Sequence, residues 1–375
     1  MKENFDVLND FNRIGLFANQ TSYNFSENKY LIEILGEKLR IVFVPEHGFF
    51  SELQDQVTLD NASAYKILNP NAEYVSVYGS NKHYSLRFPP FKLLELECLI
   101  IDIQDIGVRY FTYITSVFYL FETLKINKID LPVFVVDRPN PNIGRIEGTP
   151  LQEEYKSFIG VAGLPHCYGL SLFDVVKWLK EKVKNKNELF SLPFLENNWI
   201  QPSPNIPSKE TCRVYPGMCL VEGTTMSEGR GTTLPFQIFG SPDLRFEDLE
   251  KIRKNIEKTS GKIPELKDSW ALRPLKFIPT FHKHAKTVCN GFQIHVTNPN
   301  FHSLLFGLIL LKEISRFLEP EKLWRKGSYE FGNDKTAIEL LVGDRVLLDY
   351  LFQEISTDDL YGYMRKEEKD WSEKN

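Results

Sequence analysis

The stretch IVFVPEHGF, residues 41–49, decides the fold, because a short and fully apolar run breaks abruptly into polar residues. Three further segments share this design. The apolar runs 14–18, 99–101 and 133–136 are followed by NQT at 19–21, DIQD at 102–105 and DRPN at 137–140. Apolar runs of this length are typical of strands that are buried on both faces, as in a parallel sheet.

Helical patterns alternate with these runs, at residues 27–38 and 110–125. In the second pattern, apolar residues recur at spacings of three and four, which marks one buried helix face. Alternating strands and helices predict an α/β fold with a doubly wound, mostly parallel sheet and right-handed crossovers. Ligands bind such sheets beyond the carboxyl ends of the strands, so the polar motifs are expected to converge there.

The character of the chain changes after about residue 242. Residues 139–242 are rich in Pro and Gly and predict long loops with one helix at 172–184. The later part predicts an alternating strand, in which Phe292, Ile294 and Val296 point inward, and helices at 246–258, 302–317 and 336–352. We therefore predict a first domain of residues 1–242 that carries the catalytic loops, and a smaller α/β domain of residues 243–375.

Composition and charge exclude several classes of function. The formal net charge is −5 and no long Lys/Arg run is present, which argues against a nucleic-acid partner. No stretch approaches the roughly 20 apolar residues of a membrane-spanning helix. The N-terminal MKENFDVLND lacks an apolar signal core, so the expected location is cytoplasmic, or periplasmic or secreted if a signal was removed. The five cysteines match no metal spacing and are expected to be free thiols, and the oligomeric state is left open.

The motif at 45–49 offers a carboxylate for catalysis. Glu46 and His47 follow a predicted strand, and Gly48 lets a ligand approach closely. A carboxyl group in a partly apolar cleft can have its pKa raised towards neutrality, which suits a general acid. We assign Glu46 as a catalytic residue and His47 as a substrate contact. The alternative is a capping carboxylate beside a hydrogen-bonded histidine.

The motif at 102–109 supplies a second constellation. Asp102 and Gln104 share one face of the predicted strand, and Asp105 opens the turn into the next helix. Asp105 is either the second catalytic carboxylate or a simple helix cap. Arg109 lies in the first helical turn, where the helix dipole disfavours a cation, so a ligand contact is favoured. Asn19, after the first strand, joins Asp102, Gln104 and Arg109 as predicted substrate contacts.

Two later motifs complete the predicted site. In DRPNP at 137–141, the substrate contacts are Asp137, Arg138 and Asn140, and the alternative is a turn with an internal ion pair. The glycine-rich segment at 222–232 is not a phosphate loop, since the Lys-Ser/Thr ending is missing. Its glycines would let backbone amides and a guanidinium face an anion together. The predicted contacts in this segment are Glu222, Ser227, Arg230 and Thr232.

Metal binding and cofactors are not predicted. His166, His282 and His284 belong to no H-E-x-x-H pattern and to no Cys/His pairing. Scattered histidines are usually surface or core residues. A metal site built from Glu46, His47, Asp102 and Asp105 is the alternative.

Taken in order, these motifs resemble the bacterial exo-β-N-acetylmuramidases of the NamZ type, a glycoside hydrolase family. The matching segments lie at 15–21, PEHGF at 45–49, DIQDIGVRYFTYI at 102–114, VDRPNPNIGRIEG at 136–148, PSPNIPS at 202–208, YPGMCLVEGTTMSEGRGTTLPF at 215–236, GSPDL at 240–244 and NGFQIHVTN at 290–298. Their order and spacing cover nearly the whole chain, which makes chance a poor explanation.

The resemblance implies a Rossmann-like domain and a C-terminal domain with the site in the cleft between them. It implies release of N-acetylmuramic acid from the non-reducing end of peptidoglycan fragments, so the expected partner is a muropeptide or a related sugar. Glu46 occupies the position of the family's motif glutamate. The sequence departs from the family's motifs at two places, which are expected to affect the sugar subsites and the preferred substrate rather than the reaction. Phe50-Ser51 replaces Arg-Gly, and Cys167-Tyr168-Gly169-Leu170-Ser171 replaces Arg-His/Tyr-Gly-Met-Thr.

Most glycoside hydrolysis uses two carboxyl groups that flank the scissile bond. Glu46 is the predicted acid/base and Asp105 its partner, with Asp102, Asp137 and Glu222 in reserve, and a substrate acetamido group could assist instead. Because the chain is net acidic, a local arginine must attract the lactyl carboxylate of muramic acid, and the candidates are Arg109, Arg138 and Arg230. The rival functions are a metal-assisted hydrolase with the same acidic cluster and a non-catalytic sugar-binding protein.

Overall fold

The computed structural model describes residues 6–54, 62–79, 85–161, 163–194, 198–327, 329, 334–353 and 355–375. The chain forms two compact units. The first unit takes residues up to 107 together with 111–143 and 169–204, and the second takes 108–110, 144–168 and 205–375.

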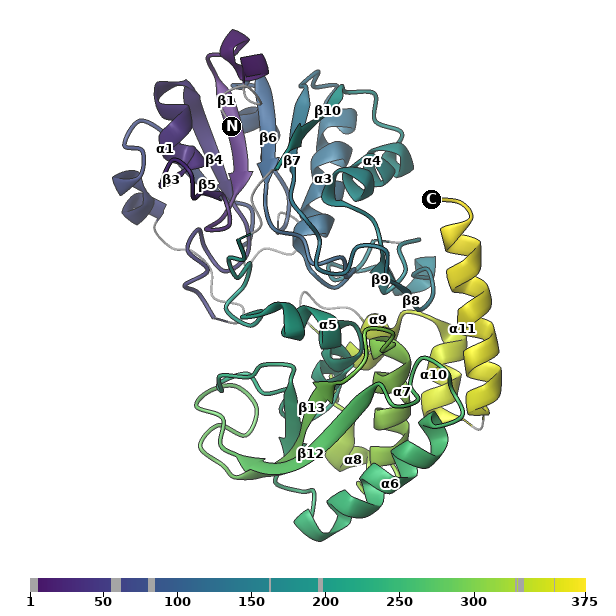
Figure 1. Cartoon of the computed structure of the whole chain (residues 1–375). Coiled ribbons are helices and arrows are strands. Elements are labelled where there is room, and N and C mark those ends of the chain that lie inside the picture. Colours follow the sequence, from purple (N-terminus) through teal and green to yellow (C-terminus); the bar gives the residue numbers. More distant parts are fainter. Residues whose placement is uncertain are drawn as a thin grey trace. The chain divides into compact units, whose positions relative to one another are not determined.

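The described part of the first unit is built on a parallel sheet of six strands in the order β10-β7-β6-β1-β4-β5 (Figure 1). The strands are β1 (Ile14–Ala18), β4 (Leu39–Val44), β5 (Glu73–Ser76), β6 (Cys98–Asp102), β7 (Val133–Asp137) and β10 (Leu189–Pro193). The chain runs outward from β1 through β4 to β5 and then continues on the other side of β1 with β6, β7 and β10. This reversal confirms the predicted doubly wound sheet and creates a switch point between β1 and β6.

Burial explains why the apolar runs form this sheet. Every residue of β1 and β6 is buried, as expected for strands covered on both faces. Leu16 in β1 pairs with Val42 in β4 and with Ile100 in β6. The carboxyl ends of these three central strands therefore lie at one edge of the sheet.

The helices of the first unit are α1 (Leu31–Leu35), α2 (Pro90–Leu93), α3 (Tyr113–Ile126) and α4 (Leu172–Val183), and β2 (Tyr23–Asn24) pairs with β3 (Lys29–Tyr30). α3 and α4 lie side by side (Figure 1), and the Lys125 ammonium donates to the Val183 carbonyl at 2.7 Å. The predicted helix at 27–38 is confirmed only from Leu31 on, as α1 and the short 3-10 helix that follows it. The first residues of the predicted helix close the β2–β3 hairpin, and Gly36 ends α1 with a φ of +56°.

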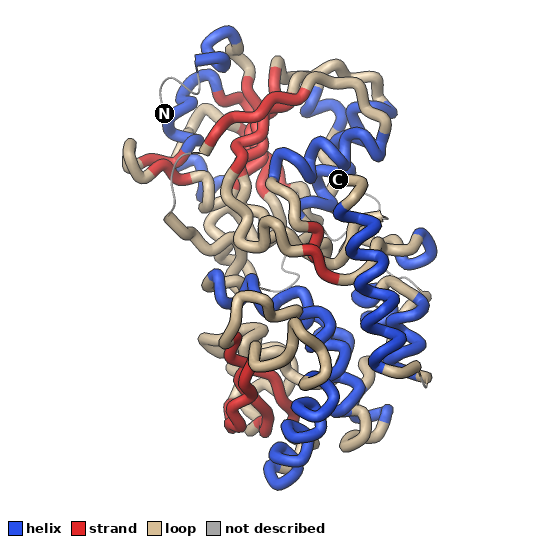
Figure 2. The backbone as a smooth tube through the Cα atoms, turned by 45° about the vertical axis from the view of Figure 1, so that its right-hand side comes forward, coloured by secondary structure: helices blue, strands red, loops and turns tan. Residues whose placement is uncertain are grey.

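The second unit combines a small antiparallel sheet with a group of helices on one side of it (Figure 2). The sheet has the order β11-β13-β12, with β11 (Ile238–Ser241), β12 (Trp270–Phe277) and β13 (Cys289–Val296), and β8 (Ile146–Glu147) pairs with β9 (Cys167–Tyr168). The helices are α5 (Lys209–Met218), α6 (Leu249–Ser260), α7 (Ser303–Ile314), α8 (Pro320–Leu323), α9 (Ala337–Val342), α10 (Arg345–Phe352) and α11 (Thr357–Ser372). Short 3-10 helices along the chain are Asp6–Asp10, Gly36–Lys38, Ala62–Ile67, Glu153–Tyr155, Cys219–Gly223 and Phe246–Asp248.

The predicted strand around Phe292 and Ile294 is confirmed, with both side chains buried in β13. The predicted helix at 336–352 is wrong in one respect, because it is two helices. Gly343 adopts a left-handed φ of +59° after α9, and the Asp344 carboxylate accepts the Val346 and Leu347 backbone N–H groups to cap α10. A glycine followed by a capping aspartate is a sequence signal for such a break.

The division into units differs from the predicted boundary at residue 242, since residues 205–242 pack within the second unit. There α5 crosses α7 so closely that a Cβ on Gly217 would lie 1.9 Å from the Ser303 carbonyl oxygen. Gly307 faces the Gly217 backbone across the same crossing. Segments 108–110 and 144–168 also belong to the second unit, which is therefore not the smaller of the two.

The five cysteines are buried free thiols, as predicted. Among the described residues, no helix has the length and apolar character needed to cross a membrane.

Candidate active site

Polar side chains meet at the carboxyl ends of β1 and β6, where the winding of the sheet reverses. The Gln104 backbone N–H donates to the Thr21 hydroxyl at 3.1 Å, and the Ser22 hydroxyl donates to the Asp102 carboxylate. The Asn19 amide donates to the Pro202 carbonyl at 3.0 Å and to the Tyr113 hydroxyl at 3.2 Å. The predicted convergence after these strands is therefore found in the first unit.

Glu46 lies at the same edge, two residues after β4. Its side chain is half-buried, and its Oε2 accepts a hydrogen bond of 2.7 Å from the Thr112 hydroxyl. The Tyr113 hydroxyl donates to the Pro202 carbonyl at 2.8 Å and lies 3.4 Å from the Glu46 carbonyl oxygen. Burial, together with the nearby charge of Glu46, raises the pKa of Tyr113, so its phenol remains a neutral donor.

The loop after Glu46 is held in an unusual backbone conformation. His47 has a φ of +76°, which is uncommon for a residue other than glycine, and Gly48 follows with +84°. The Leu53 N–H donates to the His47 carbonyl at 3.0 Å, and the His47 Nδ1 lies 3.0 Å from the Leu53 carbonyl oxygen. A Cβ on Gly48 would lie 2.6 Å from the Glu52 carboxylate. Strained loops of this kind are common at functional sites, and His47 here makes its contact within the loop.

A buried ion pair links β6 and β7. Arg138 Nε donates to Asp102 Oδ1 at 2.6 Å, and the two side chains are 5% and 3% exposed. The Arg138 guanidinium also lies over the Phe194 ring at 4.1 Å. Arg138 therefore pairs with Asp102 of β6 and not with its neighbour Asp137, which differs from the alternative of an ion pair inside the turn.

Asp105 is buried, and its Oδ2 accepts the Gly107 N–H at 3.0 Å. It does not cap the following helix, because the N-cap position of α3 is Thr112. Gly107 has a φ of +73° and packs so closely on the Asn140 amide that a Cβ would lie 2.4 Å from it. Asp105 therefore fixes the turn after β6, and its catalytic role stays a prediction.

The remaining predicted contacts of the first unit bind neighbouring loops. The Gln104 side-chain amide donates to the Pro139 carbonyl at 2.8 Å, and the Asn140 amide donates to the Leu170 carbonyl at 2.9 Å. Asp137 Oδ1 accepts the Phe173 N–H at 3.0 Å, near the start of α4. These three side chains hold the loops at the carboxyl edge together.

Arg109 has a structural role in the second unit, contrary to the predicted substrate contact. Its side chain is 1% exposed, and its guanidinium donates to the backbone carbonyls of Thr149, Leu164, Leu341 and Val342 at 2.8–3.2 Å. Its Nη2 also lies 2.8 Å from His166 Nε2. Burial lowers the pKa of Arg109 to about 10, which leaves it charged at neutral pH. A guanidinium enclosed in this way is not available to a ligand.

The glycine-rich segment forms a charge network in the second unit. The Arg230 guanidinium donates to Glu222 Oε1 at 2.8 Å, and the Tyr329 hydroxyl donates to Glu222 Oε2 at 2.8 Å. The Lys283 ammonium lies 3.0 Å from the carboxylate of Glu228. Burial alone would raise the pKa of Glu228, but the positive charge of Lys283, with His282 and Arg230, holds it well below its usual range.

Ser227 and Thr232 stabilise the turn in this glycine-rich segment through hydrogen bonds to the backbone of Gly229. The Ser227 hydroxyl accepts the Gly229 N–H at 3.1 Å, and the Thr232 hydroxyl donates to the Gly229 carbonyl at 2.6 Å. Glu228 was not assigned from the sequence, although it stands inside the quoted motif. Its position between a serine and a glycine, two residues typical of turns, was the signal available in the sequence.

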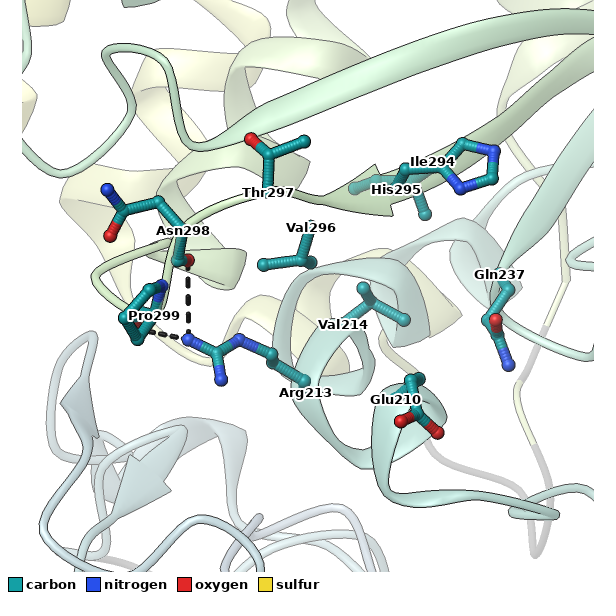
Figure 3. Close-up of a pocket in the computed structure, with 10 residues that line it drawn as sticks. All are labelled: Glu210, Arg213, Val214, Gln237, Ile294, His295, Val296, Thr297, Asn298 and Pro299. Carbon is teal, nitrogen blue, oxygen red and sulfur yellow. Dashed lines mark hydrogen bonds between the residues drawn. The ribbon is translucent and has the colours of Figure 1, made fainter.

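A cavity of about 400 Å³ lies in the second unit, between α5 and the end of β13 (Figure 3). Its walls include Val214 and Ile294, and Arg213 donates to the Asn298 carbonyl at its margin, at 3.3 Å. None of the site residues assigned from the sequence lines this cavity. Within the described part of the chain, no group of three or more His, Cys, Asp or Glu side chains is arranged to hold a metal ion.

The structure thus places the predicted site residues in both units. The first unit brings together Asn19, Glu46, His47, Asp102, Gln104, Asp105, Asp137, Arg138 and Asn140, and the second contains Arg109, Glu222, Ser227, Arg230 and Thr232. Sequence reasoning missed Thr112 and Tyr113, which contact Glu46. Both stand in the quoted segment 102–114, but their apolar neighbours favoured a plain helix.

Comparisons with known proteins agree with this architecture. Residues 14–210 match the family model of the exo-β-N-acetylmuramidase NamZ N-terminal region, and residues 213–375 match that of its C-terminal region. A relative from Bacillus subtilis, peptidoglycan β-N-acetylmuramidase NamZ, is 34% identical over 319 residues, which are 80% of this chain and 72% of the relative.

Two solved structures of DUF1343 family proteins from Bacteroides fragilis share the fold. One has a TM-score of 0.78 at 24% identity, and the other has 0.71 at 22%. Each comparison covers 99% of this chain and 94% of the solved one. Since the two family models together span nearly all of the sequence, the chain belongs to the exo-β-N-acetylmuramidase NamZ family.

Proposed function

We propose that this chain is an exo-β-N-acetylmuramidase in which Glu46 transfers the proton at the scissile bond. Membership of the NamZ family makes the chain a glycosidase that acts on peptidoglycan. One observation carries the role of Glu46: it is a half-buried carboxylate at the switch-point edge of the sheet, with one oxygen held by Thr112. A carboxyl group that is held in place and still reachable can protonate a leaving oxygen.

Asp105 is the proposed second carboxylate, acting as a nucleophile or as the base that activates water. Asp102 is less suited, because Arg138 and Ser22 already occupy both of its oxygens. Asp137 stays in reserve; it accepts the Phe173 N–H, as Asp105 accepts the Gly107 N–H. If the substrate acetamido group attacks instead, Asp105 has an orienting role.

The exo action is tested with a defined chain of alternating sugars that carries N-acetylmuramic acid at its non-reducing end. We expect free N-acetylmuramic acid to be the first product seen by chromatography, since the enzyme should remove one terminal sugar at a time. Products that arise only from internal bonds would contradict the exo assignment. Binding of the chain without any cleavage would favour the sugar-binding alternative.

We further propose that Arg138 or Arg230 binds the lactyl carboxylate that distinguishes muramic acid from glucosamine. Arg230 is the first choice, because its side chain is 17% exposed whereas that of Arg138 is 5% exposed. Arg230 and Lys283 both pair with the buried carboxylate of Glu228, at 3.6 and 3.0 Å. The Arg230 guanidinium is held by Glu222 through Nη2, and a guanidinium is the side chain best suited to grip a carboxylate bidentately.

For Arg230→Met, we expect kcat/KM for an N-acetylmuramide to fall by about 10–150-fold, the cost of one charged hydrogen-bond partner. Hydrolysis of a glucosaminide, which lacks the carboxylate, should change far less. If Arg230→Met does not fold, Arg230→Lys takes its place, because lysine keeps a positive charge opposite Glu222. It should show the same selective loss, on the muramide and not on the glucosaminide. Arg273→Met, at an exposed position of β12, is the matched control. Equal losses on both substrates in the Arg138 and Arg230 variants would refute the assignment.

A further inference from the structure

The hydroxyl group of Thr112 is used in an unexpected way. Thr112 stands at the N-cap position of α3, where a threonine side chain normally accepts a backbone N–H of its own helix. The chain uses such caps elsewhere: Ser171, Ser208 and Ser356 accept an N–H from α4, α5 and α11, respectively. Thr112 makes no cap hydrogen bond. Its hydroxyl donates instead to Glu46 Oε2 at 2.7 Å.

This choice costs helix stability, because an N-cap hydrogen bond normally stabilises the start of a helix. Thr112 has a φ of −60° and a ψ of −15°, so its backbone is already helical. Extended backbone, as at Ser171, is what directs an N-cap side chain towards its own helix. The helical backbone conformation of Thr112 is therefore consistent with a side chain that points away from α3 and contacts Glu46 in the loop after β4.

The bond fixes one of the two oxygens of the Glu46 carboxyl group. A glutamate side chain otherwise samples several rotamers, and half-burial does not restrict it to one. The Glu46 backbone is restrained as well, through the loop that His47 and Leu53 close. With Oε2 held by Thr112, the orientation of the other oxygen is determined.

We propose that Thr112 is a positioning residue that holds the Glu46 carboxyl group in its reactive orientation. The inference rests on the proposed role of Glu46 in glycoside hydrolysis. Thr112 acts through Glu46 and does not itself exchange a proton with the substrate. Its contribution is to turnover, since a misplaced acid slows the chemical step while the sugar contacts remain.

The test is the pair Thr112→Val and Thr112→Ser. Valine keeps the shape of threonine and removes the hydroxyl, so kcat should fall by about 10-fold or more while KM changes little. Serine keeps the hydroxyl and should restore kcat. Because the hydroxyl caps no helix, the melting temperature of Thr112→Val should stay close to that of the wild type. Thr123→Val is the matched control, since Thr123 lies in α3 and donates to the Tyr119 carbonyl.

A double variant separates this inference from the proposed function. If Thr112 acts through Glu46, the valine substitution should have little further effect in a Glu46→Gln background. Full activity of Thr112→Val beside an inactive Glu46→Gln would overturn the inference and leave the proposed function intact. A lower melting temperature with unchanged kcat would also overturn it, by showing a structural cap. An active Glu46→Gln would instead move the acid role to another carboxylate, and the proposed role of Glu46 would fall with it.

Discussion

Glu46→Gln is expected to lower kcat by about 10²–10⁴-fold, the usual contribution of a positioned proton donor or acceptor. Glutamine has nearly the same shape and can still accept the hydrogen bond from Thr112, but it cannot donate an acidic proton. The loop around it, closed between His47 and Leu53, does not depend on the Glu46 charge. The variant should therefore fold as the wild type does, and the loss should appear in turnover measured on an N-acetylmuramide.

A matched control is Glu27→Gln, because Glu27 is exposed in the turn between β2 and β3. That variant should retain full activity and the same melting temperature. If Glu46→Gln turned over at nearly the wild-type rate, the acid role would pass to another carboxylate, with Asp105 as the first to test.

The second large effect concerns stability. Arg109→Met should destabilise the second unit by about 3–5 kcal/mol, the range found when a buried charged partner is removed. The substitution removes the Arg109 donor from the carbonyls of Thr149 and Leu341. The Leu164 carbonyl keeps the Leu151 N–H, and the Val342 carbonyl keeps its contact with His166. Each unsatisfied buried polar group costs about 1–3 kcal/mol. The measurement is the urea midpoint of unfolding, which should fall at an unchanged slope.

Arg245→Met provides the control for this experiment. Its side chain is 74% exposed and pairs with Asp248 on the surface, so the change should be below about 1 kcal/mol. An unchanged midpoint for Arg109→Met, combined with a loss confined to muramide hydrolysis, would restore the substrate role predicted from the sequence.

The parallel sheet could be predicted because its signal is local. The apolar runs at 14–18, 41–44, 99–101 and 133–136 all became strands of one sheet, since only burial on both faces explains unbroken apolar segments. The helix predicted at 27–38 was wrong at its start, where Lys29 and Tyr30 form the second strand of a hairpin and the Tyr30 ring packs edge-on against Tyr23.

The candidate site could be predicted only in part, because the type of a residue does not reveal which other residues its side chain contacts in the fold. Asp102, Arg138 and Glu46 were identified from their motifs, and all three lie at the carboxyl edge of the first unit. Arg109 was misjudged, since the carbonyls that enclose it come from segments up to about 230 residues away in the chain. Thr112 was missed because it stands inside the helix predicted at 110–125, where its apolar neighbours favoured a plain helix.

The most direct test of the account is the initial rate at which the purified protein releases a chromophore from a chromogenic β-N-acetylmuramide. We expect multiple turnovers by the wild type and a rate about 10²–10⁴-fold lower for Glu46→Gln under the same conditions. Release of no chromophore by the wild type, or equal rates for the two proteins, would contradict it.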